Sequence, residues 1–186
     1  MLATPGSLPP AGVEDRWAFE VKQDGQRAMV YLPGGGNGDP VVRSGADITT
    51  AYPELTALGS VFGRPAVLDR EIVALDREGR SDFERPQSRM GLTGSPAKAA
   101  RMAQLVPAHL ILFDAVHLDD HNLTRLPYTE RRSLLEGLEL PGVHWSTPTA
   151  VGRLAVGPKL ATSRNRELRI LQLLKDRGHP EWSPGL

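Results

Sequence analysis

The chain has 186 residues, of which 40% are hydrophobic and 24% charged, values typical of a soluble globular protein of one domain or slightly more. Lysine plus arginine and aspartate plus glutamate both number 22, so the zero net charge gives no general argument for binding nucleic acid or membrane. A DNA-binding face would have to be local. The absence of cysteine excludes disulfides and thiolate zinc sites and agrees with a cytoplasmic protein. No apolar run approaches the roughly 18 residues of a membrane span, so we expect no membrane partner. The N-terminal residues 1–12 lack a basic start and an apolar core, so we expect no secretion signal.

The first part of the chain is expected to be an extended lead-in followed by short strands. Residues 1–16 are rich in proline and glycine. Asp24-Gly25 lies between two β-like runs, and this dipeptide is a strong hairpin signal. The elements expected here, in chain order, are strands at 17–22, 27–32 and 41–43 and a helix at 49–58.

The middle of the chain alternates apolar β-branched runs with segments of helical spacing. The expected elements are a strand at 66–75, a turn at 76–79, helices at 83–90 and 97–102, a strand at 108–116, a helix at 128–137 and a short strand at 145–148. Hairpin-linked strands with interspersed helices indicate the α+β class, with antiparallel sheets.

The composition changes after residue 150. We therefore expect one folded domain at 1–150 and a divergent C-terminal tail at 151–186. Within the tail, apolar residues at helical spacing with basic flanks predict a helix over 164–177. The apolar positions are Leu168, Leu171 and Leu174.

Lys22 is the first candidate for chemistry. A lysine amine is a nucleophile only when unprotonated, and its reference pKa of about 10.4 makes that state rare at neutral pH. The apolar residues Trp17, Phe19 and Val21 precede Lys22 and favour its partial desolvation, which lowers a lysine pKa. Arg27, across the expected hairpin, could hold a ribose or phosphate oxygen. Taken alone, however, the pattern favours a surface hairpin with ordinary charges, because Asp-Gly turns flanked by charges are common.

The wider pattern resembles a known family. The segment from Lys22 to Arg27 resembles the Lys-x-Asp-Gly-x-Arg motif of covalent nucleotidyltransferases, the ATP-dependent DNA ligases and mRNA capping enzymes. Its surroundings resemble the bacterial DNA ligases of non-homologous end joining. Further pieces that resemble this family follow in its order: Met1–Pro5, Arg43–Gly45 with Asp47–Thr49 and Tyr52–Leu55, Leu68–Ala74, Leu112–Asp114 with His117–Asp119, and Pro127-Tyr128 with Arg131-Arg132. The likeness covers residues 1–150.

The resemblance implies an adenylation domain with the nucleotidyltransferase (ATP-grasp-like) fold, built of antiparallel sheets with flanking helices. It implies that Lys22 attacks the α-phosphate of ATP to form lysyl-AMP, and that the AMP then passes to a DNA 5′-phosphate. The other implied roles are Glu20 near the adenine, Arg27 and Arg43 on ribose or phosphate, Glu71 on the ribose or a divalent metal, and Phe113 stacked on the adenine. The implied cofactors are ATP and Mg²⁺ or Mn²⁺. The implied partners are broken or nicked DNA in the nucleoid and end-joining repair proteins, with the chain acting as a monomer.

Several residues of these motifs also have an ordinary structural interpretation. Glu71 fits a salt-bridged carboxylate in an apolar strand, and Phe113 fits a core residue. Arg43 fits a solvated edge position. Asp114 fits a local ion pair or cap, and His117 fits a structural role in a strand.

The chain departs from the family pattern at two positions and near its end. Arg70 stands where the family has glycine before the glutamate, and we expect it to crowd the pocket or move the strand if that glycine allowed a close backbone approach. Asp120 stands where glycine usually follows the Leu-Asp of the nucleoside motif. The fourth motif, Glu-Gly-Val-Val-x-Lys, and the fifth, with its Lys-x-Lys, are absent as written.

These departures predict a chain truncated after the nucleoside-binding motif, without the OB-fold domain and with impaired activity. Codons for Glu181–Pro184 can read Gly-Val-Val-Ala when shifted by one base, so a frameshift after Val151 is one explanation. A genuine short variant is the other. The alternative functions are a non-catalytic nucleotide- or DNA-binding remnant and a small interaction domain.

Overall fold

The computed structural model describes residues 17–21, 23–35, 37–42, 46–82, 84–140, 142–148 and 168–172. The chain forms two compact units. The larger comprises Gln23–Thr124 and Arg131–Pro148, and the smaller comprises Met1–Lys22, Arg125–Glu130 and Thr149–Leu186. Because the smaller unit joins segments far apart in the sequence, this division is not linear, and the domain boundary at residue 150 stays a prediction.

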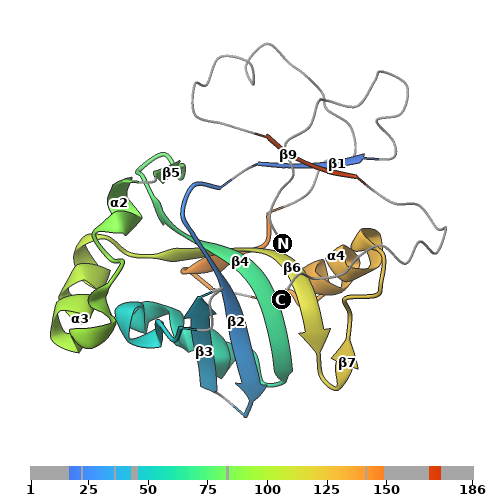
Figure 1. Ribbon diagram of the computed structural model, residues 1–186, viewed down its shortest axis with the longest axis horizontal. Coiled ribbons are helices and arrows are strands. Elements are labelled where there is room, and N and C mark those ends of the chain that lie inside the picture. Colours follow the sequence, from blue (N-terminus) through green and yellow to red (C-terminus); the bar gives the residue numbers. More distant parts are fainter. Residues whose placement is uncertain are drawn as a thin grey trace. The chain divides into compact units, whose positions relative to one another are not determined.

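One mainly antiparallel sheet forms the larger unit (Figure 1). Its strands run in the order β3-β2-β4-β6-β7, with β5 paired to β4 and β8 paired to β6. The strands are β2 (Gln26–Gly34), β3 (Asn37–Val42), β4 (Pro65–Leu75), β5 (Ser81–Asp82), β6 (His109–Leu118), β7 (His121–Asn122) and β8 (Trp145–Ser146). Only the β6–β8 pairing is parallel among these described strands. The expected α+β class with antiparallel sheets is confirmed.

The core lies against one face of this sheet. Because side chains alternate between the two faces of a strand, the cross-strand register determines which residues share a face. The apolar residues that the register places together on the buried face are Ala28, Val30, Leu32, Leu68, Ile72, Leu110 and Leu112, each no more than 2% exposed. Burying one large aliphatic side chain of this kind contributes about 1.5–3 kcal/mol.

Short helices cover the sheet and its edges. They are α1 (Ala57–Val61), α2 (Glu84–Gln87), α3 (Pro96–Leu105), α4 (Tyr128–Glu136) and the 3₁₀ turns η2 (Thr49–Ala51), η3 (Pro53–Leu55) and η4 (Leu92–Gly94). Helix α1 packs against β2 and β3, and α2 packs against β4. The single helix expected at 49–58 is wrong, because Tyr52 precedes Pro53 and has φ −133° and ψ 61°, outside the helical region.

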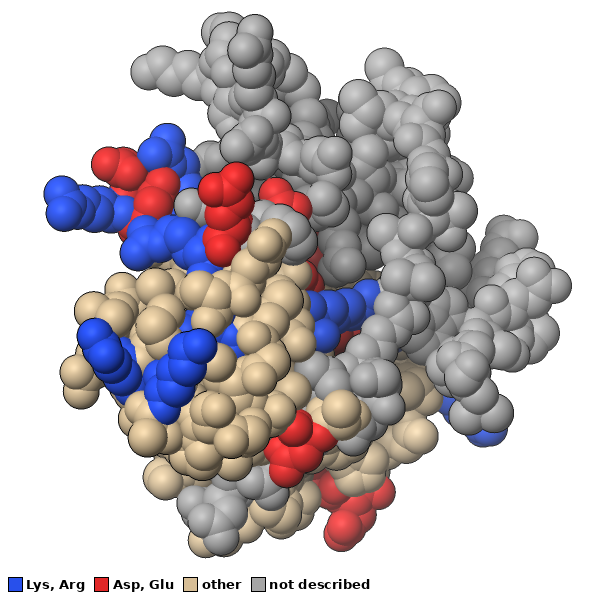
Figure 2. All heavy atoms as spheres, turned by 60° about the vertical axis from the view of Figure 1, so that its left-hand side comes forward, with Lys and Arg blue, Asp and Glu red and all other residues tan. Residues whose placement is uncertain are grey.

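The turn expected at 76–79 is confirmed. The Asp76 N–H donates to the Arg80 carbonyl at 2.9 Å, and Gly79 has a φ of 75°, which favours glycine. The face drawn in Figure 2 carries both positive and negative side chains, in keeping with the balanced composition. Among the described residues, no helix is long and apolar enough to cross a membrane.

The smaller unit contains a two-stranded antiparallel pair. Strand β1 (Trp17–Val21) pairs with β9 (Leu168–Gln172), from Trp17 opposite Gln172 to Val21 opposite Leu168. At these five positions the helix expected over 164–177 is wrong. The leucine spacing favours a helix only locally, and pairing with a distant strand overrides it. The other positions of that expected helix lie outside the described residues.

The expected Asp24-Gly25 hairpin is also wrong. Strand β1 pairs with β9, whereas β2 pairs with β3 and β4. Gly25 has another role: a Cβ there would lie 2.1 Å from the Ile72 carbonyl oxygen and 3.0 Å from Val73 Cγ1. Glycine at this position therefore allows the chain entering β2 to approach β4 closely.

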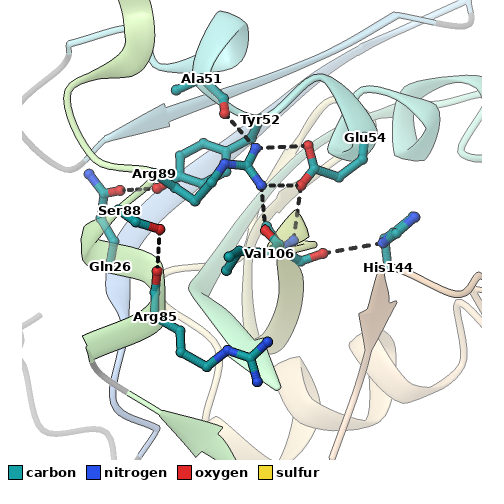
Figure 3. Close-up of polar contacts among 10 residues, drawn as sticks. Gln26, Ala51, Tyr52, Glu54, Arg85, Ser88, Arg89, Val106 and His144 are labelled. Carbon is teal, nitrogen blue, oxygen red and sulfur yellow. Dashed lines mark hydrogen bonds and ion pairs between the residues drawn. The ribbon is translucent and has the colours of Figure 1, made fainter. Parts of the chain in front are cut away.

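Arg89 is a buried cation with nearly complete hydrogen bonding (Figure 3). Its side chain is 1% exposed and forms a two-pronged ion pair with Glu54, with nitrogen–oxygen distances of 2.7 and 3.1 Å. It also donates to the carbonyls of Ala51 and Val106, each at 2.7 Å. Glu54 accepts a further bond from the Ala108 N–H at 2.9 Å, so this ion pair joins three segments of the chain.

Arg70 is the contrasting buried cation. It is 0% exposed, and its hydrogen bond to the Met29 carbonyl is long, 3.4 Å from a terminal nitrogen to the oxygen. Its Nε and other terminal nitrogen have no hydrogen-bond partner in the structure as described. Burial lowers the pKa of Arg70 to about 9, which is the expected sign for a cation removed from water.

We predict that Gly25→Ala lowers the free energy of unfolding by about 1–3 kcal/mol, because the added methyl group collides with a backbone carbonyl. Urea denaturation measures the change. The control is Gly63→Ala, where a Cβ meets nothing within 4 Å and φ is not in the left-handed range. That control should be neutral or stabilising by up to about 1 kcal/mol. Equal effects of the two substitutions would contradict the close approach at Gly25.

We predict that Arg70→Met raises the free energy of unfolding by about 1–4 kcal/mol, because it replaces a poorly bonded buried charge with an apolar side chain of similar length. The matched variant is Arg89→Met, which should lower the free energy of unfolding by about 3–5 kcal/mol because it leaves Glu54 buried without its partner. Thermal and urea denaturation at pH 7 report both values. A loss of stability in Arg70→Met would show that its charge is well compensated.

Candidate functional site

The face of the large sheet opposite its core carries charged side chains on adjacent strands. The register pairs Arg27 of β2 with Glu71 of β4, and Asp69 of β4 with Asp114 of β6. Directly paired residues lie on the same face, and so do residues two apart on one strand. The pairing therefore brings these four residues together, although they lie up to 87 positions apart in the sequence (114 minus 27).

Arg27 is held at two points on this face. Its Nε donates to Asp69 Oδ1 at 3.0 Å, and a terminal nitrogen donates to Asp69 Oδ2. Its guanidinium carbon lies 5.4 Å from the centre of the Phe113 ring, within the range of a cation–π contact. The Arg27 and Asp69 side chains are 15% and 10% exposed, so this two-pronged ion pair is mostly shielded from water.

A β-bulge positions Phe113. Asp69 pairs with Asp114 and Arg70 pairs with Leu112, so Phe113 is the extra residue on β6. A bulge changes the direction of side chains relative to regular alternation. The half-buried Phe113 ring can therefore lie beside Arg27 although its neighbour Leu112 is in the core. The core interpretation of Phe113 is incomplete, because its ring contacts a cation and remains partly exposed.

Helix α4 supports this bulge. Arg131 donates to both carboxylate oxygens of Asp114, each at 2.9 Å. Arg132 donates to the Phe113 carbonyl at 3.2 Å and to Glu136 at 2.8 Å. The ion pair suggested for Asp114 in its structural interpretation is present, and it fixes the backbone on both sides of the bulge.

Glu71 lies on β4 opposite Arg27 on one side and opposite Ile111 on the other. Its side chain is partly exposed and has an interaction partner within the chain. Its placement opposite Arg27 agrees with a role on this face. The sequence assigned no role to Asp69, although its two-residue spacing from Glu71 is the signal that would have put it on the same face.

Glu20 belongs to the smaller unit. It lies on β1, is 7% exposed and accepts a hydrogen bond from the Tyr128 hydroxyl at 2.7 Å. The sequence did not predict this contact, because it joins residues 108 positions apart. Lys22 and Arg43, the predicted nucleophile and phosphate contact, lie outside the described residues.

The structure corrects the expectation for Arg70. Its side chain lies on the core face, because Arg70 pairs with Ala28 and Leu112, which are themselves buried. It therefore does not crowd the opposite face, which carries Glu71. The strand accommodates the arginine at the cost of a poorly bonded guanidinium in the core.

Comparison with known proteins identifies a family. Residues 1–144 match the family described as the ATP dependent DNA ligase domain. The LigD protein of Bacillus subtilis, a bifunctional non-homologous end joining protein, is 32% identical over 145 residues, covering 73% of this chain and 23% of that protein. The multifunctional LigD of Mycolicibacterium smegmatis is 35% identical over 141 residues, with 74% and 16% covered. A protein of Streptomyces avermitilis described as a probable DNA ligase is 38% identical over 144 residues, with 74% and 27% covered. The chain thus spans about a quarter or less of the length of these relatives.

Solved structures agree with this assignment. The ligase domain of Mycobacterium tuberculosis LigD matches with a TM-score of 0.65 and 32% identity, covering 81% of this chain and 45% of that one. A mycobacterial DNA ligase D in complex with ATP and MES matches with a TM-score of 0.64 and 31% identity, with 80% and 44% covered. These matches confirm the fold and the family that the motifs predicted. The chain belongs to the ATP-dependent DNA ligase family and carries its adenylation domain.

Proposed function

We propose that this chain forms a covalent lysyl-AMP intermediate and acts in the sealing of DNA breaks in repair and recombination. The observation that carries the proposal is the meeting of Arg27, Glu71 and Phe113 on one face of the sheet, in a chain whose family is ATP-dependent. One of the similar structures is complexed with ATP, which supports ATP as the nucleotide.

Lys22 is the proposed nucleophile. In the step, the unprotonated amine attacks the α-phosphorus of ATP, a nitrogen–phosphorus bond forms, pyrophosphate leaves and the amine loses a proton. An oxygen of a DNA 5′-phosphate then attacks the phosphorus of the bound AMP, the nitrogen–phosphorus bond breaks and the lysine amine is regenerated. A DNA 3′-hydroxyl finally attacks the phosphorus of that 5′-phosphate, so that a phosphodiester bond forms, AMP leaves and the hydroxyl loses its proton. Such phosphoryl-type transfers depend on alignment and charge neutralisation more than on covalent assistance.

The sheet face supplies groups suited to a nucleoside. We assign Phe113 to stack on the adenine, an interaction worth about 1–3 kcal/mol per base. The contact between Arg27 and the ring directs the guanidinium to the same place, where it can meet ribose or phosphate oxygens. We assign Glu71 to the ribose hydroxyl and Glu20 to the adenine. Arg43 is assigned to phosphate, including the DNA 5′-phosphate.

A divalent cation fits these residues through Glu71. No group of three or more His, Cys, Asp or Glu side chains within the described part of the chain is arranged to hold a metal. Mg²⁺ commonly binds one or two carboxylates and completes its shell with substrate phosphates and water, so one glutamate beside ATP suffices. When bound, Mg²⁺ or Mn²⁺ neutralises charge on the phosphate oxygens. Asp69 and Asp114 are engaged by Arg27 and Arg131 and are not assigned to the metal.

We propose duplex DNA with a nick or break as the substrate, end-joining repair proteins as partners, and a monomer in the nucleoid as the acting form.

The 186 residues carry no Glu-Gly-Val-Val-x-Lys segment as written. That segment ends in a lysine, and losing one positive group at the α-phosphate can lower a rate by about 10²–10³-fold. We therefore propose that this chain adenylates slowly.

We predict that incubation with α-labelled ATP and Mg²⁺ leaves a covalent label on the wild-type chain. The label should resist denaturing electrophoresis and be absent from Lys22→Ala, because only the Lys22 amine forms the bond. The matched control is Lys98→Ala, which removes an exposed lysine of α3 and should be labelled like wild type. Reversible ATP binding without a label would favour the nucleotide-binding remnant. Neither binding nor label would favour the interaction domain.

We predict that Phe113→Leu weakens ATP binding by about 1–3 kcal/mol, because leucine offers no π-face to the purine. Phe113→Trp is the conservative variant and should retain most of the affinity. Equilibrium titration with ATP measures both. If Phe113→Leu binds ATP like the wild type while its folding is unchanged, the ring does not stack on the base.

A further inference from the structure

Three successive residues tie the start of β2 to its surroundings. Gly25 packs directly on the Ile72 carbonyl, Gln26 accepts a hydrogen bond from Tyr52, and Arg27 pairs with Asp69. This short segment begins three positions after Lys22 in the sequence. The start of β2, anchored at three successive residues, is therefore a fixed point close in sequence to the proposed nucleophile.

The Gln26 contact lies on the side of the strand opposite Arg27. The Tyr52 hydroxyl donates to Gln26 Oε1 at 2.7 Å, and Tyr52 is 0% exposed. Neighbouring residues of a strand face opposite ways, so Gln26 is anchored from the core side while Arg27 is anchored on the proposed nucleotide face. The two contacts together restrain the strand on both of its faces at this point, so it can neither shift nor rotate freely.

Tyr52 is itself fixed by the buried ion pair (Figure 3). The Arg89 guanidinium carbon lies 5.1 Å from the centre of the Tyr52 ring. The guanidinium is held by Glu54 and by the carbonyls of Ala51 and Val106. The Tyr52 side chain is therefore held in place where its hydroxyl donates to Gln26.

The hydroxyl is a permanent donor. Burial raises the pKa of Tyr52 to about 12, so the group stays protonated throughout the neutral range. A phenylalanine would fill the same core space without the cost of burying a hydroxyl. What the hydroxyl adds to the ring is its hydrogen bond to Gln26.

We infer that Tyr52 is a positioning residue for lysine adenylation, which acts by holding Gln26 and through it the segment that follows Lys22. The inference rests on the proposed function. Tyr52 touches neither nucleotide nor nucleophile in this role. Its effect falls on the alignment of the amine with the α-phosphate, where a displacement of about 1 Å can cost 10²-fold in rate.

The test compares Tyr52→Phe with Tyr31→Phe, which removes a hydroxyl from a tyrosine that is 46% exposed. Tyr52→Phe should lower the adenylation rate at saturating ATP by about tenfold and leave the ATP concentration for half-maximal rate nearly unchanged. Tyr31→Phe should match the wild type in both. A wild-type rate in Tyr52→Phe, or a loss confined to ATP affinity, overturns the inference.

The route through Gln26 is tested by combining variants. Gln26→Met keeps the side-chain length and removes the acceptor, so it should slow adenylation by about the same factor as Tyr52→Phe. The double variant should then be no slower than either single one, because both remove the same bond. Losses that multiply in the double variant would show that Tyr52 acts by another route.

A second measurement separates this inference from the proposed function. If the wild-type chain takes no label, the proposed function fails, and the Lys22 amine is followed instead by its rate of acetylation relative to Lys98, read by mass spectrometry. A change in this ratio of about twofold or more in Tyr52→Phe but not in Tyr31→Phe supports the positioning of Lys22. An unchanged ratio overturns it.

Discussion

The antiparallel register of β4 with β2 and β6 is the constraint on which the site depends. It places Arg27 opposite Glu71 and Asp69 opposite Asp114, and it directs the intervening Arg70 into the core. Because the side-chain period of a strand is two, a slip of one residue would exchange these faces. The same register keeps the charged residues near one another and the apolar residues on the packed side.

Charge on the sheet face opposite the core is organised in ion pairs. Asp69 holds Arg27 beside the Phe113 ring, and Arg131 holds Asp114 one residue further along β6. Two-pronged ion pairs that are mostly shielded from water are stronger and more directional than exposed ones. The ring and the guanidinium are thus preorganised, which would lower the ordering cost of binding the proposed nucleotide.

The core also supports the start of β2, from the side of the sheet opposite Arg27. Glu54 and Arg89 join the turns around Tyr52 to the strand entrance at Ala108, and Tyr52 carries that rigidity to Gln26. Arg70 shows what an arginine costs without such partners, since two of its nitrogens stay unbonded in the described structure. Arg89 therefore joins separate segments of the domain, whereas Arg70 destabilises the core and is offset by the packing around it.

The sequence by itself determined the family, the α+β class, the strands at β4 and β6 and the identity of the nucleotide-face candidates Arg27, Glu71 and Phe113, because ordered motifs and residue periodicity are local properties. Tertiary structure decided the rest. The Asp24-Gly25 hairpin and the helix over 164–177 were wrong where described, because β1 pairs with a strand about 150 residues away. The bulge at Phe113, the Tyr128 contact to Glu20 and the inward direction of Arg70 also depend on distant partners. No local pattern encodes a register between strands that meet only after folding.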